Sequence, residues 1–188
     1  MRLTILHALA LLVLPAAAAR AQQTAPDAFA RGTWHFETEA SAAFEAWNYN
    51  GSHEDLFGLT QAVTYGVGDG FALRGAQRFF YVSQRAEDAV LLGLTIGVRQ
   101  RIGRHGRVTG FVQGDLGIAY TAIATPPRGT RFNYLAIGGG GVMIRTSPRV
   151  HVVTTALLTH VSNASLKGPS RNPDIEALGV TVGMNLRF

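Results

Sequence analysis

The chain has 188 residues, no cysteine and a formal net charge of +5. This length suits one domain, and the lack of cysteine excludes disulfides, thiolate metal sites and a lipid anchor on an N-terminal cysteine. The positive charge is typical of nucleic-acid-binding proteins, but Lys and Arg are scattered and form no basic helix or long basic run. We therefore do not expect nucleic-acid binding.

Residues 1–21 have the features of a secretory signal peptide. A positive start at Arg2 precedes an apolar run, and the segment ends in the small-x-small pattern Ala19-Arg20-Ala21. We predict cleavage after Ala21. An uncleaved anchor helix is the alternative, but the apolar run is too short to span a bilayer, and no later stretch reaches about 18 apolar residues.

Residues 22–31 are polar and are expected to form a loose periplasmic lead-in, which leaves 32–188 as the folded domain. From residue 32 onward the hydrophobic pattern has a period of two. In the segment 34–45, even positions are mostly apolar and odd positions are mostly polar. A strand separates two such sets onto opposite faces, whereas a helix mixes them.

The same alternation recurs along the rest of the chain. It predicts strands over 55–67, 71–83, 89–100, 108–120, 150–162 and 175–188, whereas the Gly-rich segment 132–145 is hard to phase. Tight turns near Asp69, His105 and Pro148 alternate with longer loops near Asn50, Arg85, Pro127 and Lys167. Short periplasmic turns and long outer loops are typical of outer-membrane barrels. The sequence thus predicts an all-β fold, an eight-stranded antiparallel up-and-down transmembrane β-barrel.

The charges favour a membrane barrel over a soluble lipocalin-like barrel, which also has alternating strands. One face of the strands is almost free of charge, as lipid requires, because Lys or Arg at mid-bilayer costs about 2–4 kcal/mol. The terminal Phe188 resembles the assembly signal of outer-membrane barrels. We therefore predict the outer membrane as the location. The other face carries both signs and suits a polar lumen: Glu37, Glu39, Glu45, Arg74, Arg78, Arg99, Asp115 and Arg187.

One histidine stands beside a serine in a pattern that could support catalysis. His160 precedes Ser162 by two residues, so both side chains point from the same face of a strand. Serine needs an adjacent base to become a nucleophile, and that base needs a third group to orient it. Glu176, at the start of the last strand, could be that group. The other histidines have no partner at metal-ligand spacing, so we predict no metal site and no cofactor: His35, His53, His105 and His151.

Strand parity places these three residues on the outside of the barrel. Glu176 begins the apolar row that runs through Leu178 to Phe188, which we expect to face lipid. If the last two strands pair with an even index sum, His160 and Ser162 share this face. Polar groups there suit a lipid substrate. They also occur at membrane interfaces without any chemistry, so a non-enzymatic barrel with a structural or adhesive role is the alternative.

The segments His160-Val161-Ser162-Asn163-Ala164 and Asn172-Pro173-Asp174-Ile175-Glu176 resemble the C-terminal signature of the lipid A 3-O-deacylase (PagL-type) family. The resemblance implies an outer-membrane serine esterase that removes an ester-linked acyl chain from the 3-O position of lipid A. It implies Ser162 as nucleophile, His160 as general base, Glu176 as orienting acid and Asn163 in the oxyanion hole. At Asp174 the chain departs from the glycine of the family pattern.

The resemblance also suggests partners for the chain. We expect lipid A in lipopolysaccharide, the outer-membrane bilayer and, through Phe188, the barrel-assembly machinery; a homodimer is left open. Basic residues in or near the outer loops are candidates for contacts with lipid A phosphates, although solvated loop charges are an equal alternative. These residues are Arg128, Arg131, Lys167 and Arg171.

Overall fold

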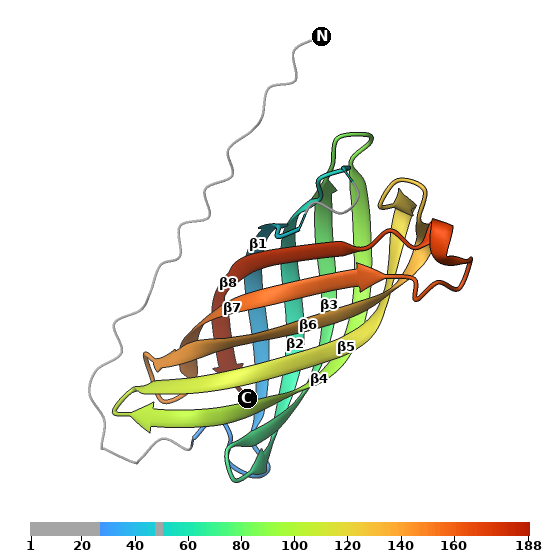
Figure 1. The fold of residues 1–188 in the computed structure, drawn as a ribbon. Helices are drawn as coiled ribbons and strands as arrows, with labels where there is room; N and C mark the ends of the chain where they lie inside the picture. The colour runs from blue at the N-terminus through green and yellow to red at the C-terminus, as the bar shows by residue number, and fades with distance from the viewer. Residues whose placement is uncertain (1–26, 48–50) are drawn as a thin grey trace, which may run out of the picture.

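The structure is a computed structural model that describes residues 27–47 and 51–188. Its strands form one closed antiparallel barrel in which each strand pairs with its neighbours in the chain and β8 closes onto β1 (Figure 1). The predicted eight-stranded up-and-down barrel is therefore confirmed. The strands are β1 (Trp34–Glu45), β2 (Asp55–Gly68), β3 (Phe71–Ser83), β4 (Ala89–His105), β5 (Val108–Thr125), β6 (Thr130–Arg145), β7 (Val150–Ser162) and β8 (Ile175–Arg187).

The loop between β7 and β8 contains a short 3-10 helix, η1 (Pro169–Arg171). This loop extends from the same end of the barrel as the β5–β6 loop (Figure 1). No helix within 27–47 and 51–188 is long and apolar enough to cross a membrane.

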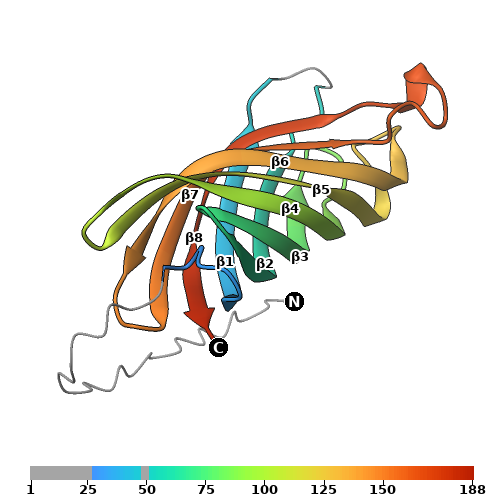
Figure 2. The same ribbon diagram turned by 90° about the horizontal axis from the view of Figure 1, so that it is seen from below.

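The segment before β1 is packed rather than loose. The predicted signal peptide and residues 22–26 of the lead-in lie outside the described residues, but 27–31 approach the barrel end (Figure 2, blue segment before β1). Phe29 is buried in a cluster with Phe111 and Met143, and Asp27 forms an ion pair with Arg101. Burial of one aromatic side chain thus corrects the expectation of a loose lead-in for these residues.

The Gly-rich segment that sequence could not phase is strand β6. Its odd positions face inward, as the burial of Asn133, Leu135 and Ile137 shows. At Gly141 a Cβ atom would lie 2.1 Å from the Thr154 carbonyl oxygen, so no side chain fits there. Because glycine has no side chain, this segment lacks the alternation of residues from which the inward and outward faces of a strand are assigned. The sequence therefore did not show which positions of β6 face inward.

The outer face of the barrel is apolar and has aromatic residues at both ends. Trp34 packs on Tyr65 at the end with the short turns, with a ring separation of 4.7 Å. Phe44 packs against Phe57 at the opposite end, with a ring separation of 5.9 Å. Between these ends the outward rows are largely aliphatic, as in the strongly exposed Ile96. An apolar band between two aromatic girdles is the surface that a transmembrane barrel presents to lipid.

The interior of the barrel holds a network of buried ion pairs. Arg99 contacts Glu37 at 2.7 Å, and Arg78 contacts Asp115 at 2.7 Å. Arg74 links the two halves, since it contacts Glu37 at 3.4 Å and Asp115 at 3.1 Å. The predicted polar lumen with internal ion pairs is therefore present, and the charges meet one another instead of lipid.

Replacing Glu37 by Gln should destabilise the barrel. Glu37 is fully buried and contacts Arg99 and Arg74, so its loss leaves guanidinium charge without compensation. Removing one partner of a buried pair costs about 3–5 kcal/mol, which should appear as a lower urea midpoint for unfolding from lipid vesicles. Glu87→Gln, at an exposed loop position, is the matched control. Equal midpoints for Glu37→Gln and wild type would contradict a stabilising role for the network.

Candidate active site on the outer face of the last hairpin

The last hairpin holds the three residues that the sequence singled out. β7 ends at Ser162 and β8 begins at Ile175, and His160 is the direct cross-strand partner of Glu176. The index sum is even, which meets the condition set from the sequence, so His160 and Glu176 point to the same face of the sheet. That face is the outer one, since Leu158 and Leu178 in the same rows are exposed.

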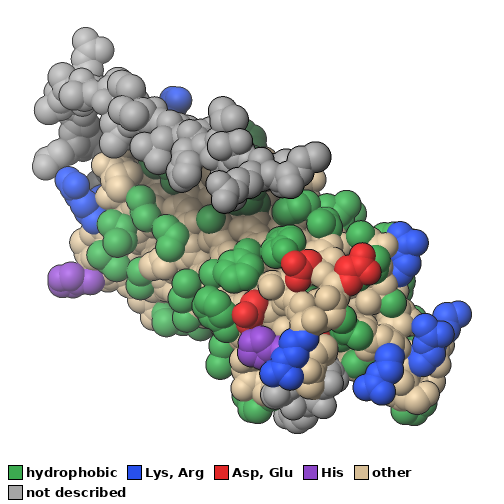
Figure 3. Space-filling view, turned by 90° about the horizontal axis from the view of Figure 1, so that it is seen from above, with side chains coloured by type: hydrophobic (Ala, Val, Ile, Leu, Met, Phe, Trp, Pro, Cys, Tyr) green, Lys and Arg blue, Asp and Glu red, His purple; other side chains and the backbone are tan. Residues whose placement is uncertain are grey.

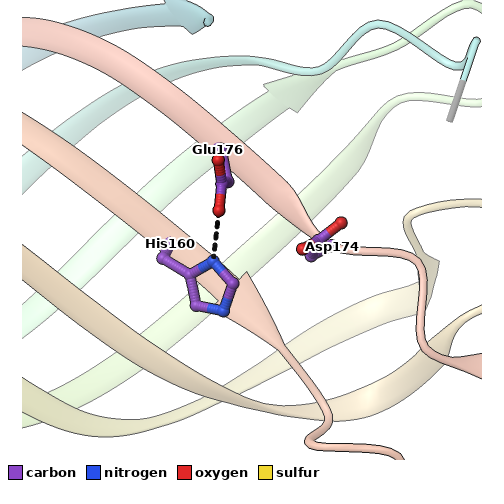
Figure 4. A group of neighbouring side chains, drawn as sticks. All are labelled: His160, Asp174 and Glu176. Atoms are coloured by element: carbon purple, nitrogen blue, oxygen red, sulfur yellow. Dashed lines mark ion pairs between the residues drawn. The ribbon is translucent and has the colours of Figure 1, made fainter. Parts of the chain in front are cut away.

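The three side chains form a chain of polar contacts. His160 Nε2 lies 3.0 Å from Ser162 Oγ, within hydrogen-bond distance. His160 Nδ1 lies 3.4 Å from the nearer oxygen of Glu176, and Figure 4 shows this contact across the two strands. The second contact is longer than a typical charge-assisted hydrogen bond. The order of the groups is hydroxyl, imidazole, carboxylate, and each ring nitrogen faces a different partner.

The site is open to the outside at the imidazole and the carboxylate. The His160 side chain is 36% exposed and the Glu176 side chain 27% exposed, whereas Ser162 is 8% exposed. β6 covers the other flank of β7, where Tyr134 pairs with Ser162 and Ala136 pairs with His160. The sequence missed these two neighbours, because their strand was the one that could not be phased.

Hydrogen bonds within the β7–β8 loop hold Asn163, the predicted oxyanion-hole residue. Its backbone N–H donates to Asn172 Oδ1 at 2.9 Å, and its side-chain amide donates to the Arg171 carbonyl oxygen. The residue is buried, and its Oδ1 atom has no hydrogen-bond partner among the described residues. In this conformation Asn163 therefore anchors the loop through its backbone N–H and one of its two side-chain amide hydrogens. Asn172, which the sequence did not single out, is its partner in that role.

The basic residues of the outer loops lie near this hairpin. Arg171 donates a hydrogen bond to the Gly129 carbonyl oxygen at 3.1 Å, so the β5–β6 and β7–β8 loops are in contact. Arg128 and Lys167 are exposed in these loops, and the Arg131 guanidinium stacks over the Tyr120 ring at 4.8 Å. Figure 3, which views the molecule from above, shows Lys and Arg side chains along one edge. The contact joins the loop that carries Arg128 to the loop that carries Lys167 and Arg171.

A second acidic group lies beside the His160–Glu176 pair. One ligand-type atom from each of His160, Asp174 and Glu176 lies within 4.8 Å of the others. Figure 4 shows Asp174 where the loop enters β8. Spacing along the chain had predicted no metal site, whereas the fold groups three residues of metal-ligating type. The signal was present in the sequence, since Asp174 and Glu176 are two residues apart and can share one face of an extended segment.

Comparisons with known proteins place the chain among outer-membrane barrels. No protein-family model and no curated protein matches it. Among solved structures, the outer membrane enzyme PagL is 16% identical over 78% of this chain and 97% of its own, with a TM-score of 0.55. Neisserial surface protein A is 12% identical over 82% and 97%, with a TM-score of 0.63. The N-terminal β-barrel domain of Pseudomonas aeruginosa OprF is 13% identical over 84% and 98%, with a TM-score of 0.56.

These likenesses establish the fold, which is that of the small barrels of the outer membrane. The closed barrel and its apolar outer face agree with the predicted location, an integral β-barrel in the outer membrane.

Replacing Asn172 by Ala should loosen the loop without unfolding the barrel. The variant loses the acceptor for the Asn163 backbone N–H, so hydrogen exchange at that amide should accelerate by at least about fivefold, as expected for a lost hydrogen bond of about 1 kcal/mol. Amide exchange read by NMR in micelles measures this. Asn172→Asp keeps an acceptor oxygen and is the matched control. Unchanged protection in Asn172→Ala would show that the loop is held by other contacts.

Proposed function

We propose that the chain is a serine esterase that hydrolyses an ester-linked acyl chain of lipid A, at the 3-O position that the family resemblance implies. The observation that carries the proposal is the contact chain Ser162–His160–Glu176 on the lipid-facing side of the barrel. A hydroxyl, an imidazole and a carboxylate in this order are the parts of a serine hydrolase. Their outward position selects a substrate that lies in the bilayer.

The contact distances suggest a role for each residue in the reaction. With its proton on Nδ1, facing Glu176, His160 leaves Nε2 free to accept the Ser162 proton as Oγ attacks the ester carbonyl. The tetrahedral intermediate collapses when His160 returns this proton to the leaving sugar oxygen, and an acyl-enzyme remains. Water activated by His160 then releases the 3-hydroxy fatty acid. The Glu176 carboxylate stabilises the imidazolium that forms in each half-reaction.

The oxyanion of the intermediate needs hydrogen-bond donors. Asn163 remains the proposed side chain for this role, since it directly follows Ser162. One of its two amide hydrogens donates to the Arg171 carbonyl oxygen. The proposal therefore assigns the other amide hydrogen to the oxyanion.

The surface around the triad suits a lipid with an anionic headgroup. Small outward residues of β6, Ala136 and Gly138, lie beside β7 opposite His160 and Leu158, and leave a shallow apolar strip for an acyl chain. Toward the outer end, the basic loop residues can bind phosphate groups through charge-assisted hydrogen bonds. These residues are Arg128, Arg131, Lys167 and Arg171.

Replacing Ser162 by Ala should abolish deacylation. The variant lacks the nucleophile, so the rate should fall at least about 1,000-fold, as in other serine hydrolases. Mass spectrometry of lipid A from cells making the protein measures this as the loss, or retention, of one 3-hydroxyacyl mass. Ser165→Ala, at an exposed position in the loop that follows β7, is the matched control and should act like wild type. Equal deacylation by Ser162→Ala and wild type would reject the catalytic assignment. No deacylation by wild type would favour the non-enzymatic barrel.

Removing basic charge from the loops should weaken substrate binding and leave the chemistry intact. In the double variant Arg128→Gln/Lys167→Gln, KM should rise at least about tenfold with kcat nearly unchanged, because even one charge-assisted hydrogen bond contributes about 1.5 kcal/mol. Kinetics on lipid A in mixed micelles would measure the two constants. Arg107→Gln, in the turn between β4 and β5 at the opposite end, is the control. An unchanged KM would indicate that these charges are only solvated.

A further inference from the structure

We propose that His160, Asp174 and Glu176 form a binding site for a divalent transition-metal ion of the zinc class, and that this ion blocks the esterase when it binds. One ligand atom from each residue lies within 4.8 Å of the others at the outer end of the last hairpin. The metal site stands on these residues alone. The block of activity rests on the proposed function.

The donor set selects the class of metal. One imidazole nitrogen and two carboxylate oxygens are ligands that Zn²⁺ accepts, with a fourth position left for water. Ca²⁺ and Mg²⁺ favour shells made of oxygen alone, so the imidazole disfavours them. Two carboxylates beside one imidazole also give the site the negative charge that a divalent cation requires.

The geometry of the His160–Glu176 contact fits a shared ion. Nδ1 and the nearer Glu176 oxygen lie 3.4 Å apart. Two ligands at about 2.0–2.2 Å from a tetrahedral zinc ion are themselves separated by about 3.4 Å. Asp174, whose ligand atom lies within 4.8 Å of the other two, has to come closer to complete the site, and it lies in the loop that leads into β8. His160 and Glu176 are partly exposed, so an ion can reach them.

A metal ion on Nδ1 is incompatible with the role proposed for His160. The ion occupies the Nδ1 lone pair, so the single proton of the neutral imidazole must reside on Nε2. Nε2 faces Ser162 Oγ at 3.0 Å and, once protonated, cannot accept the hydroxyl proton. Glu176, drawn to the ion, no longer stabilises an imidazolium. His160 and Glu176 thus serve either catalysis or the metal.

Isothermal titration of the full-length protein in detergent micelles with ZnCl₂, in a buffer that does not chelate zinc, tests the site. We expect one zinc ion per chain, with affinity lowered at least about tenfold by Asp174→Asn, which keeps the shape of the side chain. His53→Ala is the matched control, because His53 lies 2.7 Å from Glu45 and is the rival histidine–carboxylate site. Loss of binding in His53→Ala with retention in Asp174→Asn overturns the proposal, and so does the absence of zinc binding.

Ester hydrolysis measured with and without zinc tests the block. In wild type, zinc should lower the rate of ester hydrolysis at least about tenfold, and EDTA should restore it. In Asp174→Asn, zinc should lower the rate much less, in keeping with its weaker binding. Equal inhibition of wild type and Asp174→Asn overturns the inference. If zinc binds through Asp174 but no hydrolysis occurs under any condition, the proposed function fails and the metal site stands. If hydrolysis proceeds and zinc does not bind, the metal site fails and the proposed function stands.

Discussion

Backbone hydrogen bonding in a medium without water is the constraint on which the rest of this structure depends. A strand in lipid must pair on both edges, and the chain meets this demand by closing β8 onto β1. Closure makes every strand position either inward or outward, with a period of two. This parity directs Glu37 into the lumen and Glu176 to the outside, although both are glutamates within strands.

Parity also explains the contrast between the two groups of charged residues. Inside the barrel, Arg74, Arg99 and their acidic partners neutralise one another in a buried network that needs no ligand. On the outer face, Glu176 begins the apolar outward row of β8 and pairs with His160 of β7, beside a buried serine hydroxyl. Polar groups in the first setting stabilise a scaffold. In the second they are costly next to lipid, which marks them as a candidate functional site.

Much of this arrangement follows from alternation alone, because a period of two assigns residues to faces without knowledge of the tertiary structure. The strand count, the lumen charges and the shared face of His160 and Glu176 were predicted in this way. Three features of the structure could not be predicted from alternation. Gly141 and its neighbours concealed the phase of β6, and Phe29 packs through contacts distant in sequence. The hydrogen bonds that hold Asn163 depend on the path of a loop, which no periodicity describes.

The sideways opening of the His160–Ser162–Glu176 site has a kinetic consequence. A substrate for such a site arrives by lateral diffusion in one leaflet, so the rate follows its number per unit of membrane area rather than its bulk concentration. Inert lipid or detergent would slow turnover by surface dilution even where every contact in the site is intact. Under the proposed function, the released fatty acid partitions into the same leaflet. Encounter with the substrate therefore occurs by diffusion in two dimensions, and its rate depends on the crowding of the membrane.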